Sequence, residues 1–143
     1  MTPPKKGSKL LVSGSTDEWL THAESDLNFA RLAKGHTEIL PEQVCFHAQQ
    51  AAEKALKAVL LHHKIEFPLI HDIEALLEIA TQSGISLPSD VAEAGALTPY
   101  AVEARYPGYE EDVTAEQVDQ AIRLAESVVT WARTIITPHE QSS

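Results

Sequence analysis

The fold is decided by one stretch near the middle of the chain, Phe46-His-Ala-Gln-Gln-Ala-Ala-Glu-Lys-Ala-Leu-Lys-Ala-Val-Leu60. Its alanines recur at steps of three and four residues, which is the spacing of one face of an α-helix. A second apolar stripe lies beside this face, and small side chains let neighbouring backbones approach closely. The two stripes are Ala48, Ala51, Ala55 and Ala58, and Cys45, Ala52, Leu56 and Val59. The stretch therefore predicts the central helix of a helical bundle.

Polar side chains accompany this apolar seam, and we expect them at its edge. They are Gln49, Gln50, Glu53, Lys54 and Lys57. Glu53 precedes Lys57 by four residues, the order in which a glutamate and a lysine stabilise a helix best. The sequence therefore predicts an ion pair along the border of the central helix.

The first helix begins at a capping box, Ser15-Thr-Asp-Glu18, and runs to about Lys34 before Gly35. Its apolar stripe contains one carboxylate, Asp26. Either Asp26 sits at the edge of the stripe and reaches water, or it is buried with a cationic or hydrogen-bonding partner. The sequence leaves both interpretations open.

Further helices follow in order, each with its own start and stop signals. The second helix is expected from Pro41 to about His63, and a short third one begins after Asp72 as N-cap and ends at Gly84. A fourth opens at 88–90 and reaches Arg105-Tyr106, with a kink or fresh start at Thr98-Pro99. The last follows a second capping box at Thr114 and ends near Ile136.

These elements predict an all-α fold, an up-and-down antiparallel bundle of four main helices plus a short fifth helix. The chain of 143 residues suits one domain over residues 15–138, with a mobile arm at 1–14 and a polar tail at 139–143. No apolar run reaches the roughly 20 residues that cross a membrane. A single cysteine on an apolar face favours the reducing cytoplasm.

The formal charge of −10 opposes binding to long stretches of nucleic acid over a large surface. A small basic pocket for a phosphate group is compatible with it. His62 and His63 are adjacent and point in different directions from a helix, which makes a poor chelating pair. We expect no metal and no other cofactor.

The run from Cys45 to Leu61 resembles the signature helix of the HEPN family, small prokaryotic helical domains associated with nucleotides, RNA and nucleotidyltransferase partners. Three other segments support the resemblance, which extends from about Trp19 to Arg133. They are Trp19…Ala23…Asp26-Leu27…Ala30, His71-Asp72-Ile73…Leu76-Leu77, and Arg105-Tyr106-Pro107. The resemblance implies a homodimer.

Ribonucleases of the wider HEPN superfamily carry an arginine followed by four to six residues and a histidine. In such a pair the histidine transfers protons and the arginine holds the phosphate. Two stretches match by count, Arg31 to His36 and Arg133 to His139, but the first is in the wrong helix and the second contains a proline. The segment from Arg105 to Asp112, where the resemblance places the motif, contains no histidine, so the sequence leans against an enzyme.

The leading hypothesis is a HEPN-like binding module, which binds a nucleotide-like or phosphate-bearing ligand or pairs with a separately encoded nucleotidyltransferase. Two alternatives stay open, a metal-independent endoribonuclease of the toxin type, as in toxin–antitoxin pairs, and a dimeric scaffold without a ligand.

Arg105 is the residue on which we base the predicted ligand site. It ends a helix before Pro107, so its side chain is expected to have a defined direction. We expect Arg105 to pair with Asp26 inside the bundle, while Tyr106, Lys54 and His71 line an adjoining cleft. The alternative is that Arg105 lies at the surface and complements the C-terminus of its helix.

Overall fold

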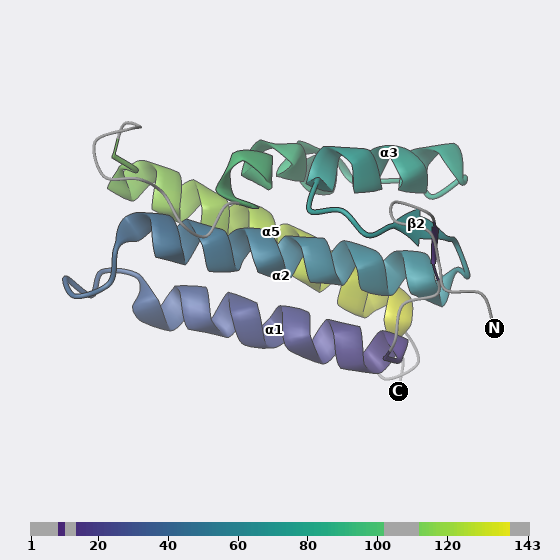
Figure 1. The fold of residues 1–143 in the computed structure, drawn as a ribbon, viewed down its shortest axis with the longest axis horizontal. Helices are drawn as coiled ribbons and strands as arrows, with labels where there is room; N and C mark the ends of the chain where they lie inside the picture. The colour runs from purple at the N-terminus through teal and green to yellow at the C-terminus, as the bar shows by residue number, and fades with distance from the viewer. Residues whose placement is uncertain (1–8, 11–13, 102–111, 138–143) are drawn as a thin grey trace.

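Three long helices dominate the structure, a computed structural model that describes residues 9–10, 14–101 and 112–137. They are α1 (Thr16–Ala33), α2 (Pro41–His62) and α5 (Ala115–Ile136). The central helix α2 packs against both α1 and α5, and α1 runs in the opposite direction to α2 (Figure 1). The predicted all-α bundle is confirmed.

The long helices begin where local signals predicted. The Ser15 hydroxyl accepts a hydrogen bond from the backbone N–H of Glu18, whose carboxylate accepts one from the N–H of Ser15. Thr114 and Gln117 form the same reciprocal box at the start of α5. Pro41 occupies the first turn of α2, where its missing N–H costs nothing.

The second half of the bundle consists of shorter helices. Asp72 caps α3 (Ile73–Gln82) by accepting from the N–H of Ala75, as predicted. The four-residue α4 (Ser89–Ala92) continues directly into a 3₁₀-helix, η1 (Glu93–Ala101). The sequence indicated a kink or fresh start at Thr98-Pro99, but the change from α to tighter 3₁₀ winding occurs earlier, at Glu93, and η1 continues through both residues.

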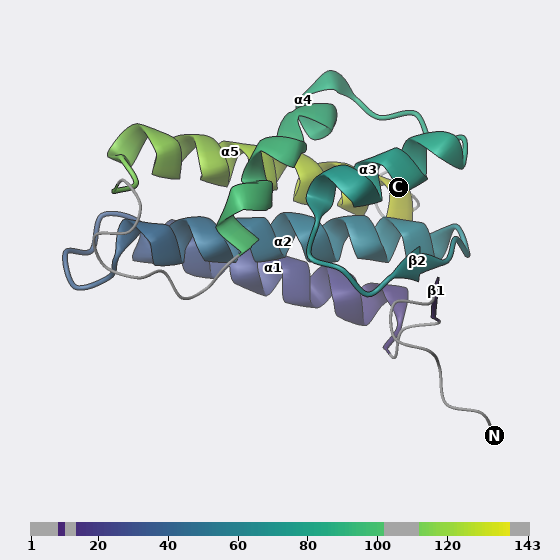
Figure 2. The same ribbon diagram turned by 45° about the horizontal axis from the view of Figure 1, so that its top comes forward.

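A two-residue strand pair was not predicted. β1 (Lys9–Leu10), inside the expected N-terminal arm, pairs antiparallel with β2 (Phe67–Pro68) in the connection between α2 and α3 (Figure 2). Segments of two residues are too short to show the alternation by which strands are recognised in a sequence.

The core follows the two stripes of α2. All eight side chains of these stripes are fully buried, so the prediction of a close-packed alanine seam is confirmed. Across the described residues, no helix combines the length and apolar character needed to cross a membrane.

Candidate functional site

Three of the polar side chains on α2 are buried, and the prediction that they lie at the edge of the seam was wrong. Gln49, Glu53 and Lys57 follow one another at four-residue steps and form a single row along the helix. α2 contacts α1, α3, α5 and η1, so nearly its whole circumference faces other elements. The spacing was visible in the sequence, but the number of helices surrounding α2 was not.

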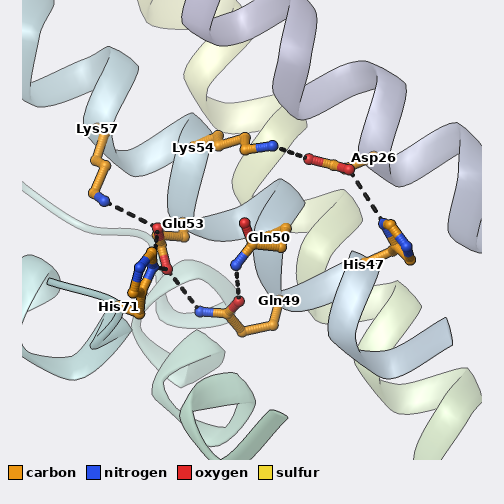
Figure 3. Close-up of polar contacts among 8 residues, drawn as sticks. All are labelled: Asp26, His47, Gln49, Gln50, Glu53, Lys54, Lys57 and His71. Carbon is orange, nitrogen blue, oxygen red and sulfur yellow. Dashed lines mark hydrogen bonds and ion pairs between the residues drawn. The ribbon is translucent and has the colours of Figure 1, made fainter. Parts of the chain in front are cut away.

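The carboxylate of Glu53 is the centre of this row (Figure 3). Lys57 Nζ donates to its Oε2 atom over 2.9 Å, and Gln49 Nε2 donates to its Oε1 atom over 3.0 Å. Gln50 in turn donates to the side-chain oxygen of Gln49 over 2.7 Å. His71, from the connection before α3, places Nδ1 3.0 Å from Oε2 and 3.1 Å from Oε1 of Glu53. The predicted Glu53–Lys57 ion pair is present, with its charges inside the protein.

A second ionic cluster joins α2 to α1. Lys54 Nζ lies 2.6 Å from Oδ2 of Asp26, and His47 Nδ1 lies 3.3 Å from Oδ1 of the same carboxylate. The ring of Phe29 covers the His47 imidazole at a centroid distance of 4.2 Å. Asp26 is only 17% exposed. Of the two interpretations left open by the sequence, the carboxylate with cationic partners is therefore correct.

A cavity of about 470 Å³ opens between the start of α1 and the middle of α2. Its lining residues are Gly14, Glu18, Trp19, His22 and Lys54. The ammonium group of Lys57 lies 6.0 Å from the centroid of the Trp19 ring, which connects the cavity wall to the buried row. One aromatic ring and groups of both charges thus surround the same space.

The charge on Glu18 at this cavity is held in place by the helix cap. Hydrogen bonds from the backbone N–H and then the side chain of Ser15 keep the pKa of the Glu18 carboxyl below its ordinary value. Glu18 therefore keeps its negative charge to a lower pH than an ordinary glutamate, in the cavity that Lys54 also lines.

The arrangement can hold a flat ring and an anionic group together. An indole ring offers a large apolar face for stacking, and a lysine ammonium bonds to phosphate oxygens as a point charge. From the sequence, Trp19 was identified only in a segment that supports the family resemblance and was given no role in a ligand site. Its role in the cavity depends on α2 bringing Lys54 to the same wall.

The structure brings together some of the predicted ligand residues. Lys54 and Asp26 are bonded to each other, and His71 belongs to the neighbouring cluster around Glu53. Arg105 and Tyr106 lie outside the described residues, so their predicted pairing with Asp26 and the cleft stays a prediction.

The arginines of both candidate nuclease motifs cross-link α1 and α5. Arg31 donates to Glu126 over 2.8 Å, and Arg133 forms an ion pair with Glu24 at 2.6 Å. His36 lies in the exposed turn after α1, and His139 lies outside the described residues. Each guanidinium is thus engaged by a glutamate of the neighbouring helix.

Metal binding has no support from geometry in the described ranges. No group of three or more His, Cys, Asp or Glu side chains in these ranges converges in a way that could hold a metal ion.

Comparison with known proteins relates the chain to one family. The sequence profile of the HEPN domain matches residues 16–135. The structure is similar to ST0689, described as an archaeal HEPN homologue, with 29% identity and a TM-score of 0.68 over 87% of this chain and 100% of that chain. It is also similar to TT1696 from Thermus thermophilus, with 28% identity and a TM-score of 0.69 over 82% of this chain and 95% of that chain.

No protein of curated function matches the sequence. The profile match, however, covers most of the chain, including α1, α2, all but the last residue of α5, and both ionic clusters of α2. The chain belongs to the HEPN domain family.

Proposed function

We propose that this HEPN domain is a binding module that holds a nucleotide-like, phosphate-bearing ligand in the cavity between α1 and α2. The observation that carries the proposal is that Trp19 and Lys54 line the same space of about 470 Å³. Binding sites for small molecules commonly have volumes between about 300 and 1,000 Å³. The cavity is therefore large enough for a mononucleotide.

The two ends of such a ligand find different partners. The base stacks on Trp19, with Lys57 on the protein side of the ring at 6.0 Å. The phosphate approaches Lys54, whose side chain is 25% exposed while it bonds Asp26. His22 lies on the same wall and offers a second donor through its ring N–H.

The charge distribution favours a small ligand over a long nucleic acid. The net charge of −10 repels an extended polyphosphate backbone, whereas a single phosphate needs only a local cation. The carboxylates of Glu18 and Asp26 beside the cavity also limit the number of phosphate groups that it accommodates.

Tryptophan fluorescence tests the proposal directly. The chain has two tryptophans, so Trp131→Phe leaves Trp19 as the only indole. In this background, titration with AMP and ATP is expected to quench Trp19 saturably. Lys54→Met is expected to weaken binding about tenfold or more, because a hydrogen bond to a charged group is lost.

Lys34→Met is the matched control. Lys34 also forms an ion pair between α1 and another helix, with Asp119 at 2.5 Å, but it lies outside this cavity. Binding by this variant should equal that of the parent. An absence of quenching up to millimolar nucleotide, in protein that is folded by circular dichroism, would refute the proposed ligand class.

The proposed function involves two protein partners, a second copy of this chain and a nucleotidyltransferase. We propose a homodimer that acts in the cytoplasm and pairs with a separately encoded nucleotidyltransferase. The exposed Phe29 and Leu32 lie one turn apart on α1 and offer an apolar patch to a second copy. A nucleotidyltransferase gene beside the gene for this chain, followed by co-purification of the two expressed proteins, would support the pairing.

A further inference from the structure

His71 differs from the other described histidines in combining a buried carboxylate partner with an exposed ring. Its side chain is 69% exposed, whereas that of Glu53 is 3% exposed. His47 also has a carboxylate partner, but its ring is covered by Phe29. His62 and His63 are exposed at the end of α2, where their rings contact each other edge to face.

The contact with Glu53 fixes which nitrogen of His71 carries the proton. An ionised carboxylate only accepts hydrogen bonds, and Glu53 lies 3.0 and 3.1 Å from Nδ1. In the neutral ring, the proton is therefore on Nδ1, and Nε2 has a free lone pair. Because the ring is largely exposed, this lone pair is accessible from solvent.

Glu53 itself is held firmly in position. Gln49 and Lys57 donate to its two oxygens from one turn before and one turn after on the same helix. The Lys57 charge balances that of the carboxylate in the interior, so Glu53 does not need to turn towards water. A positioned carboxylate, an imidazole and an exposed nitrogen are the parts of an activated histidine nucleophile.

We propose that Nε2 of His71 is an acceptor for a phosphoryl group from a reactive donor of the phosphoramidate or acyl-phosphate class. The Nε2 lone pair attacks phosphorus and forms a P–N bond, while the bond from phosphorus to the leaving group breaks. With phosphoramidate, whose nitrogen is already protonated, the leaving group is ammonia. The proton on Nδ1 stays on the ring, and the positive charge that the ring gains faces Glu53.

Glu53 is a positioning residue in this step. Its hydrogen bond to Nδ1–H strengthens as the ring becomes positive, which lowers the barrier at Nε2 without contact between Glu53 and the donor. His71 does not line the cavity beside Trp19, and the proposal does not depend on nucleotide binding there.

The test is to incubate the purified full-length chain with phosphoramidate and map acid-labile phosphohistidine by mass spectrometry and ³¹P NMR. His62 and His63 serve as internal references, since they are exposed on the same chain. His71 is expected to be labelled at Nε2 about tenfold faster than either reference. Equal labelling of the three histidines, or labelling that spares His71, would overturn the proposal.

A double variant, Glu53→Gln with Lys57→Met, removes both charges of the buried pair together. Labelling of His71 is expected to fall to the rate of His62, and ¹⁵N NMR should show the ring leaving the Nδ1–H tautomer. A purely structural role of Glu53 would leave the tautomer unchanged. Unchanged labelling in the folded double variant would refute the role of Glu53. If the variant does not fold, the labelling rates of His71, His62 and His63 in the wild-type chain still test whether His71 is the preferred acceptor.

Discussion

Lys57 and Glu53 form an ion pair inside the bundle, with Lys57 Nζ 2.9 Å from the Oε2 atom of Glu53 and the two side chains 6% and 3% exposed. An ion pair between neighbouring turns of a helix usually lies in solvent and contributes little to the stability of the fold. Here His71 and Gln49 complete the hydrogen bonding of the carboxylate. The pair therefore anchors the loop before α3 to the central helix.

Lys57→Met is expected to destabilise the protein by about 3–5 kcal/mol, because the Glu53 carboxylate keeps its charge in the interior without its main partner. The free energy of unfolding from urea denaturation measures the effect. In the double variant with Glu53→Gln, the loss of unfolding free energy should be smaller than the sum of the losses in the two single variants.

Arg31→Met is the control for this prediction. Arg31 and Glu126 form an ion pair of similar length, but their side chains are 46% and 37% exposed. We expect Arg31→Met to reduce the free energy of unfolding by at most about 1 kcal/mol. Equal losses in Lys57→Met and Arg31→Met would show that burial of the pair has no energetic consequence.

Asp26→Asn and Lys54→Met should be strongly coupled. The two side chains bond at 2.6 Å in a partly buried site, and we expect a coupling free energy of about 1–3 kcal/mol in a double-mutant cycle. Additive behaviour would mean that Asp26 stabilises the protein through other groups.

The same cycle with Arg105→Gln tests the partner predicted from the sequence. If Arg105 also contacts Asp26, its substitution will couple to Asp26→Asn by a similar amount. Additivity within about 0.5 kcal/mol would exclude this pair and leave Lys54 and His47 as the partners of Asp26.

Acidification should weaken the start of α1 through Glu18. The folded-state pKa of Glu18 is below the ordinary value of 4.5, so its contribution to stability is complete above that value and is lost as the pH falls through the lower, folded value. The stability difference between wild type and Glu18→Gln should therefore shrink in the acidic range.

Urea denaturation at a series of pH values down to about pH 3 measures this difference. Glu116→Gln is the control, because in α5 the neighbouring Gln117 makes the capping hydrogen bond. A wild-type advantage over Glu18→Gln that grows on acidification would contradict the prediction.

The purified chain should be a homodimer that Leu32→Glu converts to a monomer. Leu32 is 75% exposed beside Phe29, and a charge in an apolar interface is costly. Light scattering at tens of micromolar protein gives the mass. Leu69→Glu, at an exposed leucine on a different element, should leave the dimer intact. A monomeric wild-type chain would exclude the proposed assembly.

The purified chain should not cleave structured RNA in the presence of EDTA. The segment from Arg105 to Asp112, where the resemblance places the nuclease motif, contains no histidine, and the net charge of −10 opposes RNA binding. Cleavage that His36→Ala or His139→Ala abolishes would instead favour the endoribonuclease alternative.

Much of the fold was predictable because its signals are local. The capping boxes at Ser15 and Thr114 act within four residues, so they set the starts of α1 and α5 whatever the helices pack against. The alanine stripes of α2 likewise required a close-packed face. Residues 89–101 were harder to predict, because a 3₁₀-helix shares most of its composition with an α-helix.

The candidate site was only partly predictable. Lys54, Asp26 and His71 were chosen from the sequence, and each takes part in one of the two ionic clusters. Their partners were not predicted, because His71 and Glu53 are 18 residues apart and no local rule joins a loop to a helix at that separation.

By itself, the sequence determined the helices, their ends and the apolar faces, since these follow from periodicity and capping within a few residues. Only the tertiary structure decided that Gln49, Glu53 and Lys57 are buried. Helical spacing shows which side chains share a face, but burial depends on how many other elements cover that face. Four other helical elements contact α2, and the polar row of Gln49, Glu53 and Lys57 is therefore buried, with His71 bonded to Glu53.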